Sequence, residues 1–214
     1  MPELNLESNK EIAKPELRNE NHGFDPDRRI DASSMSDTKE INEQNKFDPD
    51  IRLINPKYFD DNGKLFRTDN DLLPNNSYEL NGYKYETDKD GRIVSAEGNL
   101  RLKPEGQKKK PISPKLETIA KGDQKETDDR GHIIADQFNG AGFGNLIAQD
   151  TNLNRGAYEK WEKEMASAIK EGHQVNARFE LNYKGDSHRP DRIAITYSID
   201  GEEFFKGFNN RSNL

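Results

Sequence analysis

Apolar and polar residues alternate over residues 78–85, a pattern typical of a half-buried β-strand. The polar run Asp88-Lys89-Asp90-Gly91 follows, and apolar residues return at Ile93, Val94 and Leu100. Because Asp-Gly between two such runs favours a tight turn, the pattern predicts a β-hairpin. The same stretch also has the spacing of a calcium-binding EF-hand loop that would run from residue 86 to residue 97. An EF-hand loop requires flanking helices, so the aromatic, strand-like run before it favours the hairpin.

Helical spacing is found over residues 158–171. One face of this segment would gather the apolar residues Trp161, Met165, Ala168 and Ile169. Gly172 follows immediately, and glycine is a common residue at the C-terminal end of a helix. The pattern therefore predicts a single amphipathic helix that ends near residue 171.

Strand-like alternation returns after the helix. Val175–Tyr183 and residues 193–199 are both expected to be strands, and Asp200-Gly201 then favours a turn into a returning arm at Phe204-Phe205. The expected order is two strands, a basic loop, a strand, a helix and further strands. This order predicts an α+β domain whose sheet is mostly antiparallel.

Residues 1–55 lack apolar periodicity and are rich in Asn, Glu, Asp and Pro. They contain a short pattern twice, as Phe24-Asp25-Pro26-Asp27 and as Phe47-Asp48-Pro49-Asp50, and Asp-Pro steps favour turns. Such a sequence predicts a flexible acidic leader at residues 1–55 ahead of a folded domain at residues 56–214. Alternatively, the leader is a segment that an export system or a carrier protein recognises.

Composition narrows the classes of protein that need to be considered. Hydrophobic residues make up only 30% of the chain and charged residues 34%, so part of it is expected to be unstructured. No stretch approaches the roughly 20 apolar residues of a membrane span, and the first 30 residues lack the apolar core of a signal peptide. We therefore expect any export to follow a route that reads no conventional signal peptide. The absence of cysteine excludes disulfides and thiolate zinc sites.

The net charge of −7 is distributed unevenly along the chain. Residues 1–90 sum to −8 and residues 91–214 to +1, whereas residues 101–125 alone sum to +5. Lys and Arg neutralise phosphates when a protein binds nucleic acid, so only the second half of the chain suits such a partner. The run Lys108-Lys109-Lys110 is then either a solvated loop or a loop that contacts phosphate.

The chemistry of the chain is concentrated in residues 129–162. Asp129-Arg130-Gly131-His132 is followed by Asn145, by Asn154 and, eight residues later, by Glu162. Hydrolysis of a phosphodiester needs a base to deprotonate water, a cation to hold the phosphate and oxygen ligands for a hard metal ion. The order and spacing of these residues resemble the DNA/RNA non-specific endonuclease family, the ββα-metal nucleases whose signature is DRGH followed by an N…N…E stretch.

The resemblance implies a ββα-metal core at residues 127–172 and a role for each motif residue. His132 would be the general base, since a neutral imidazole with an ordinary pKa of about 6.5 accepts a proton at neutral pH. Arg130 would clamp the phosphate. Asn154 would be the direct protein ligand of Mg²⁺, and Glu162 would hold the waters of that ion. Mn²⁺ would be able to substitute for Mg²⁺.

For the remaining candidates, alternative roles stay open. Asn145 either shapes the pocket or touches the phosphate, or it is a turn residue after Gly144. Asp129 is expected to orient the loop rather than bind metal. The family has a further basic residue upstream of the motif, and Arg101 and Lys103 are the candidates for it. The family's Pro-Gln step is Ala148-Gln149 in this chain.

The resemblance implies attack of water on phosphorus, which leaves 5′-phosphate ends on DNA and, since no ribose 2′-hydroxyl is needed, on RNA. Residues 73–83 also resemble the approach to the C-terminal nuclease domains of bacterial polymorphic and type VII toxins. That likeness implies an antibacterial toxin, delivered to a target cell and held in check by an immunity protein. The alternatives are a secreted nuclease for scavenging or DNA uptake, and a non-catalytic nucleic-acid-binding module.

Overall fold

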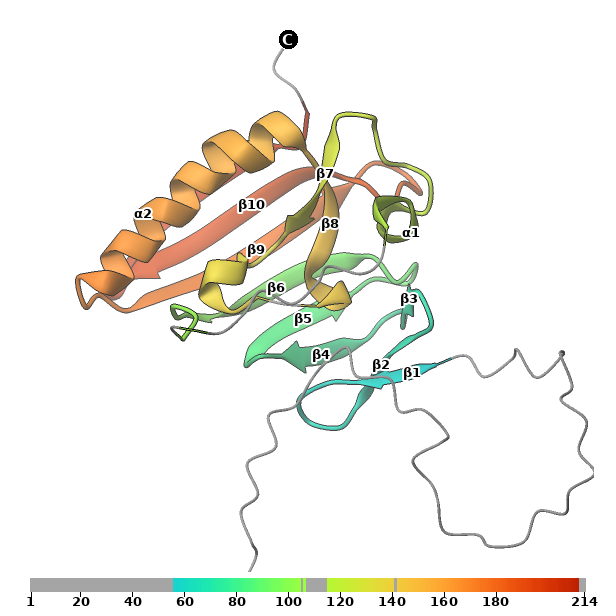
Figure 1. The fold of residues 1–214 in the computed structure, drawn as a ribbon, viewed down its shortest axis with the longest axis horizontal. Coiled ribbons are helices and arrows are strands. Elements are labelled where there is room, and N and C mark those ends of the chain that lie inside the picture. Colours follow the sequence, from blue (N-terminus) through green and yellow to red (C-terminus); the bar gives the residue numbers. More distant parts are fainter. Residues whose placement is uncertain (1–55, 105, 107–114, 141, 212–214) are drawn as a thin grey trace, which may run out of the picture.

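The computed structural model describes residues 56–104, 106, 115–140 and 142–211, and these residues form an α+β fold (Figure 1). Its centre is a six-stranded sheet in the order β11-β10-β9-β6-β5-β4, with each strand antiparallel to its neighbours. The strands are β4 (Ser77–Leu80), β5 (Tyr83–Thr87), β6 (Ile93–Leu100), β9 (Val175–Tyr183), β10 (Pro190–Ile199) and β11 (Glu202–Asn209).

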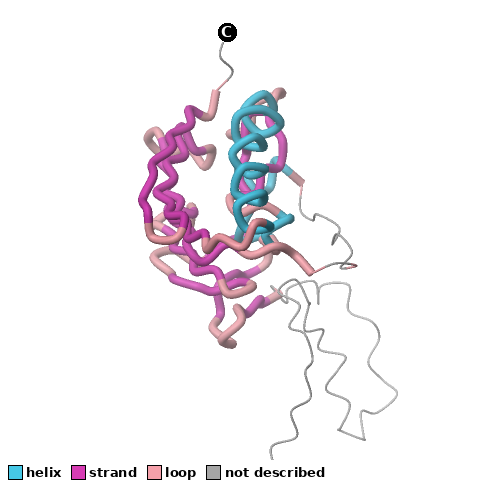
Figure 2. The backbone as a smooth tube through the Cα atoms, turned by 90° about the vertical axis from the view of Figure 1, so that its left-hand side faces the viewer, coloured by secondary structure: helices cyan, strands magenta, loops and turns pink. Residues whose placement is uncertain are grey.

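One long helix, α2 (Glu159–Lys170), covers one face of this sheet, and Figure 2 shows it to one side of the strands. The helix is anchored by Trp161, which is 2% exposed. The indole ring meets the rings of Phe179 and Tyr197 edge-on, at 5.7 and 5.6 Å between ring centres. Alternate residues of β9 point to this side and are buried, so the alternating sequence pattern produces one apolar and one solvated sheet face.

Two smaller sheets complete the fold. The strands β7 (Asp128–His132) and β8 (Leu146–Asp150) form an antiparallel hairpin, and the short helix α1 (Leu116–Ala120) precedes them. Beside the β4 edge of the central sheet, β1 (Lys57–Phe59), β2 (Leu65–Thr68) and β3 (Asp71–Leu72) form a three-stranded sheet. No helix in the described part of the chain is long and apolar enough to cross a bilayer.

The structure confirms the α+β class, the mostly antiparallel sheet, the hairpin around Asp88-Lys89-Asp90-Gly91, the helix after residue 158 and the three strands that follow it. The interpretation of residues 78–85 as one strand-like run is wrong. The chain reverses at Asn81-Gly82 between β4 and β5, and both residues have positive φ angles, 53° and 71°. A two-residue hairpin turn of this kind needs two such residues, and Asn-Gly is a preferred pair for it.

The sequence pattern also missed β8 and the sheet formed by β1 to β3. All five residues of β8 are buried, so the strand lacks the alternation that reveals a half-buried strand. The strands β1 and β3 have only three and two residues, too few for a period to be read. The two Asp-Pro copies and Lys108-Lys109-Lys110 lie outside the described residues.

Candidate active site

The strand β7 ends with the motif residues Arg130, Gly131 and His132. Side chains alternate along a strand, so Arg130 and His132 share one face of the hairpin. Gly131 lies between them because its position leaves no room for a side chain. A Cβ atom there would lie 2.1 Å from Oε1 of Gln149, the fully buried residue on the partner strand β8. Glycine at this position therefore permits the close packing of the two strands.

The turn that follows His132 is braced by Asn145, whose side chain is fully buried. Its Oδ1 accepts a hydrogen bond from the N–H of Ile134 at 2.9 Å, and its Nδ2 donates to the carbonyl of the same residue at 2.7 Å. Both polar atoms of the amide are thus engaged with the main chain. Asn145 thus braces the turn, and its contact with a phosphate stays a prediction.

Three buried tyrosines hold the loop between β7 and β8 in place. The Oη atoms of Tyr78, Tyr83 and Tyr158 donate hydrogen bonds of 2.7, 2.6 and 2.7 Å to the carbonyls of Gly144, Phe138 and Ile133, respectively. Tyr158 immediately precedes α2, and its acceptor follows His132 in the chain. These bonds therefore link the central sheet and the helix to the segment that carries the motif histidine.

Asn154 and Asp129 are joined across the hairpin and the segment that leads into α2. Asn154 lies in the π-helical segment η4 (Leu153–Tyr158), which is kinked at Gly156. Its Nδ2 donates to Asp129 Oδ2 at 3.1 Å, an arrangement that orients the amide oxygen as an acceptor. The structure thus brings the two ends of the DRGH…N motif, 25 residues apart, into direct contact.

Asp129 also binds Arg155, a residue that the sequence analysis left without a role. The guanidinium donates two hydrogen bonds to the carboxylate, at 2.8 and 2.7 Å. Partial burial acts to raise the pKa of Asp129, but the hydrogen bonds from Arg155 and Asn154 outweigh it and lower the pKa below its ordinary value. The lowered pKa favours the ionised form of Asp129, which binds both neighbours.

Glu162 lies in the first part of α2, where its side chain is half-buried. Burial, followed by the negative charge of Glu159, raises the pKa of Glu162 from 4.5 to about 7, while Lys163 opposes the shift. A carboxylate in such surroundings is costly when it is ionised and unaccompanied. A nearby cation would remove most of that cost, which makes Glu162 a suitable partner for a hydrated metal ion.

The raised pKa of Glu162 predicts how the stability of the folded protein depends on pH. In metal-free protein the folded state holds the Glu162 proton more tightly than the unfolded chain, so stability should fall as the pH rises from 4.5 to about 7. The full shift corresponds to a loss of about 3 kcal/mol, and solvent that reaches the half-buried carboxyl reduces this. We expect Glu162→Gln to remove the loss, so that in EDTA the variant melts higher than the parent at pH 8 but not at pH 4.5. Equal pH dependence of the two proteins in thermal unfolding would contradict this.

Of the two upstream basic candidates, Lys103 lies beside the loop that follows β7, and Arg101 lies beside the turn between β4 and β5. Lys103 forms an ion pair with Asp136 at 2.8 Å, and its main-chain N–H binds the carbonyl of Gln137. The guanidinium of Arg101 lies 5.0 Å from the ring centre of Tyr83 and donates to the carbonyl of Asn81. Both side chains thus have partners within the protein, and their contact with a substrate stays a prediction.

A buried ion pair that the sequence gave no sign of fixes the start of β7. Arg189 donates from Nε and Nη2 to the two oxygens of Asp128, at 2.6 and 2.7 Å, and its Nη1 binds the carbonyl of Asn210. Asn210 is fully buried and contacts the main chain of Ala148 and Asp150 in β8. These residues are far apart in the sequence, and no short motif connects them.

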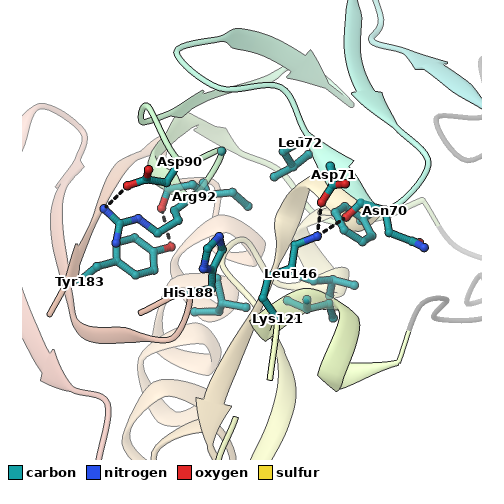
Figure 3. Close-up of a pocket in the computed structure, with 14 residues that line it drawn as sticks. Asn70, Asp71, Leu72, Asp90, Arg92, Lys121, Leu146, Tyr183 and His188 are labelled. Atoms are coloured by element: carbon teal, nitrogen blue, oxygen red, sulfur yellow. Dashed lines mark hydrogen bonds and ion pairs between the residues drawn. The ribbon is translucent and has the colours of Figure 1, made fainter. Parts of the chain in front are cut away.

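A separate small cavity of about 50 Å³ lies between β3, the turn before β6, the end of α1 and the loop before β10 (Figure 3). Its charged residues are paired with each other, Arg92 with Asp90 and Lys121 with Asp71. None of the candidate catalytic or metal residues lines it. The motif on β7, η4 and α2 therefore stays the candidate active site.

Comparison with known proteins shows the family of this chain. The sequence model of the family described as DNA/RNA non-specific endonuclease matches residues 74–201. The type VII secretion system protein EssD of Staphylococcus aureus strain USA300 is 36% identical over 138 residues, which are 61% of this chain and 22% of EssD. The probable deoxyribonuclease RhsA of Dickeya dadantii is 32% identical over 87 residues, 40% of this chain and 6% of RhsA. The matched region thus spans only about a fifth of the length of EssD.

Proposed function

This chain belongs to the DNA/RNA non-specific endonuclease family, and we propose that it is a Mg²⁺-dependent endonuclease that hydrolyses DNA, and RNA as well, to 5′-phosphate ends. The observation that supports this most strongly is the contact of Asp129 with Asn154 and Arg155. It joins the strand that carries the histidine to the helical segment that carries the proposed metal ligand. The order β7, β8, α2 further supports a ββα-metal core.

The residues at this place fit a hard divalent cation. Asn154 supplies an amide oxygen and Glu162 a carboxylate, and oxygen is the ligand that Mg²⁺ prefers. Among the described residues there is no group of three or more His, Cys, Asp or Glu side chains arranged so that it could hold a metal ion. Such a group is not needed, because Mg²⁺ keeps several waters and binds through few protein groups together with substrate phosphate. When bound there, Mg²⁺ or Mn²⁺ would neutralise phosphate charge and stabilise the leaving 3′-oxygen.

The chain's own residues would then act on water and on the phosphate. His132 takes a proton from a water molecule as the water oxygen bonds to phosphorus, and the bond from phosphorus to the 3′-oxygen breaks. The 3′-oxygen takes a proton from solvent, which leaves a 3′-hydroxyl and a 5′-phosphate. Arg130 holds the phosphate with its forked guanidinium, and Asn145 keeps the turn after His132 in shape.

We assign this activity to residues 56–214, with the catalytic core at 127–172. Residues 1–55 should be dispensable for it, since they are acidic and lack the apolar pattern of a core. A chain of residues 56–214 is therefore expected to cut plasmid DNA at the rate of the full chain. The rates of the two purified proteins are to be compared at equal concentration. A shortened chain that is folded, by circular dichroism, but inactive would show that the leader belongs to the nuclease, and so would one that fails to fold.

The biological role that we propose is that of an antibacterial toxin that is exported and delivered to a target cell. The similarity to the type VII secretion system protein EssD supports this over a scavenging or DNA-uptake nuclease. Residues 1–55 are the proposed contact for an export or carrier partner. A non-catalytic binding module is disfavoured, because both His132 and Asn154 are present.

A toxin of this kind implies an immunity protein. Residues 101–125 carry a charge of +5 in a chain whose net charge is −7, so an acidic inhibitor that mimics nucleic acid would find its complement in this basic segment. The proposed interface includes this segment or α2. We expect expression of the chain alone inside a bacterium to arrest growth, and co-expression of the immunity protein to restore it. Normal growth with active, soluble enzyme in the cytoplasm would remove the reason for such a partner.

A further inference from the structure

The two edges of the central sheet differ in how their main-chain groups are used. At the β4 edge, the N–H of Glu79 donates to the carboxylate of Asp60 at 3.0 Å, and its carbonyl accepts from the N–H of Asp61 at 2.9 Å. At the opposite edge, β11 pairs only with β10. Within the described residues no hydrogen bond reaches the outer main-chain groups of residues 202–206. An open strand edge of this kind is a template for another strand.

The strand β11 is also where large apolar side chains are exposed. Its first six residues, 202–207, are all exposed. In the described part of the chain, the large hydrophobic residues that are exposed are Phe204 and Phe205, at 37% and 63%. Phe204 stacks on Tyr197 of β10 at 5.3 Å between ring centres, so it extends the apolar surface of the sheet to the edge. Exposed aromatics at an unpaired edge indicate a contact surface.

The occupant that fits this edge is a second copy of the chain. When two identical edges pair antiparallel about a two-fold axis, the axis passes through one residue that faces its own counterpart. With the axis at Phe204, the two Phe204 rings face each other and Glu202 of each copy faces Lys206 of the other. These three residues alternate along β11 and lie on one face of it. We propose that two copies of this chain form a two-fold dimer through β11 in this register.

The neighbouring registers lack this combination of paired aromatic rings and paired opposite charges. An axis at Glu203 sets two glutamates against each other, and an axis at Lys206 sets two lysines against each other. An axis at Phe205 also pairs two aromatic rings, but it sets no opposite charges against each other, because Lys206 then faces Phe204. In the register centred on Phe204, Glu203 faces Phe205 on the other face of the strand. Only the register centred on Phe204 places an opposite charge on each side of an aromatic pair, and directly opposed pairs of this kind stabilise antiparallel strands.

Charge reversal tests the register directly. The full chain should sediment at a mass that rises with concentration towards twice the 24.5 kDa of one copy. Glu202→Lys or Lys206→Glu alone turns both opposite-charge pairs into like-charge pairs, and should raise the dissociation constant of the dimer at least about tenfold. The double variant, Glu202→Lys with Lys206→Glu, restores both pairs in reversed order. It should dimerise within about threefold of the parent.

Lys184→Glu is the matched control, because it reverses an exposed lysine in the connection between β9 and β10 without touching β11. It should leave the dimer unchanged. Each variant is checked for folding by thermal unfolding, so that loss of the dimer is not confused with loss of structure. A parent that is monomeric at every concentration would overturn the proposal. So would a dimer that tolerates the single reversals, or one that the double variant fails to restore.

Discussion

Replacing His132 by alanine is expected to lower the rate of plasmid cleavage by at least about 100-fold, the typical effect of removing a general base. In the proposed reaction this imidazole takes the proton of the attacking water, and the chain supplies the motif histidine at the end of β7. The measurement is the initial rate of plasmid nicking at saturating Mg²⁺. Added imidazole should recover part of the lost rate, because the small molecule can enter the space left by the side chain and act as the base.

His188→Ala is the matched control for this experiment. This substitution also removes an imidazole, but His188 lies at the separate cavity. Its hydrogen bond to Asp123 is donated by the main-chain N–H, which the substitution leaves in place. The control should therefore cut at the parental rate. A His132→Ala protein that cuts as fast as the parent, or as fast as His188→Ala, would show that His132 is not the base.

Asn154→Ala is expected to raise the Mg²⁺ concentration for half-maximal rate more than Glu162→Ala does. Asn154 is proposed to bind the ion directly, whereas Glu162 acts through its waters, and loss of such an outer partner typically weakens a metal site about 10- to 100-fold. The side chain of Asn154 is already oriented by its 3.1 Å hydrogen bond to Asp129. The Asn154→Ala substitution therefore removes a ligand that the protein holds in position. The measurement is a Mg²⁺ titration of the cleavage rate for both variants.

Asn152→Ala serves as the control for the metal titration. Asn152 is exposed and lies just before η4. Its main-chain N–H donates a hydrogen bond to Asp150, and the substitution leaves this group in place. The Mg²⁺ dependence of this variant should equal that of the parent. Parental curves for both Asn154→Ala and Glu162→Ala would contradict the assignment of the metal site to these residues.

Periodicity was sufficient for the elements in which one face is apolar and the other is solvated. The helix α2 and the strand β9 belong to this class, because their environments impose periods of 3.6 and 2 on the sequence. Periodicity failed for β8, because this strand is buried on both faces and therefore shows no alternation of apolar and polar positions. It also failed at Asn81-Gly82, where two positive-φ residues end one strand and begin the next without interrupting the aromatic pattern.

The spacing of the motif residues was sufficient to locate the candidate site. It did not show which contacts hold the site in place. The spacing of Asn154 from Asp129 gave no indication that the two side chains touch, nor that Arg155 would share the carboxylate. The pair of Arg189 with Asp128 spans 61 residues, and the bond from Tyr78 to Gly144 spans 66. Such contacts depend on how distant elements pack, which no local pattern encodes.

The most direct test of the central claim is incubation of the purified full chain with plasmid DNA and with single-stranded RNA, each with Mg²⁺ and with EDTA. A Mg²⁺-dependent endonuclease should convert supercoiled plasmid to nicked and then linear DNA only when Mg²⁺ is present. The new ends should accept radiolabelled phosphate only after phosphatase treatment, because hydrolysis at the 3′-oxygen leaves a 5′-phosphate. Undiminished cleavage in EDTA, 5′-hydroxyl ends, or an intact plasmid at all Mg²⁺ and Mn²⁺ concentrations would contradict it.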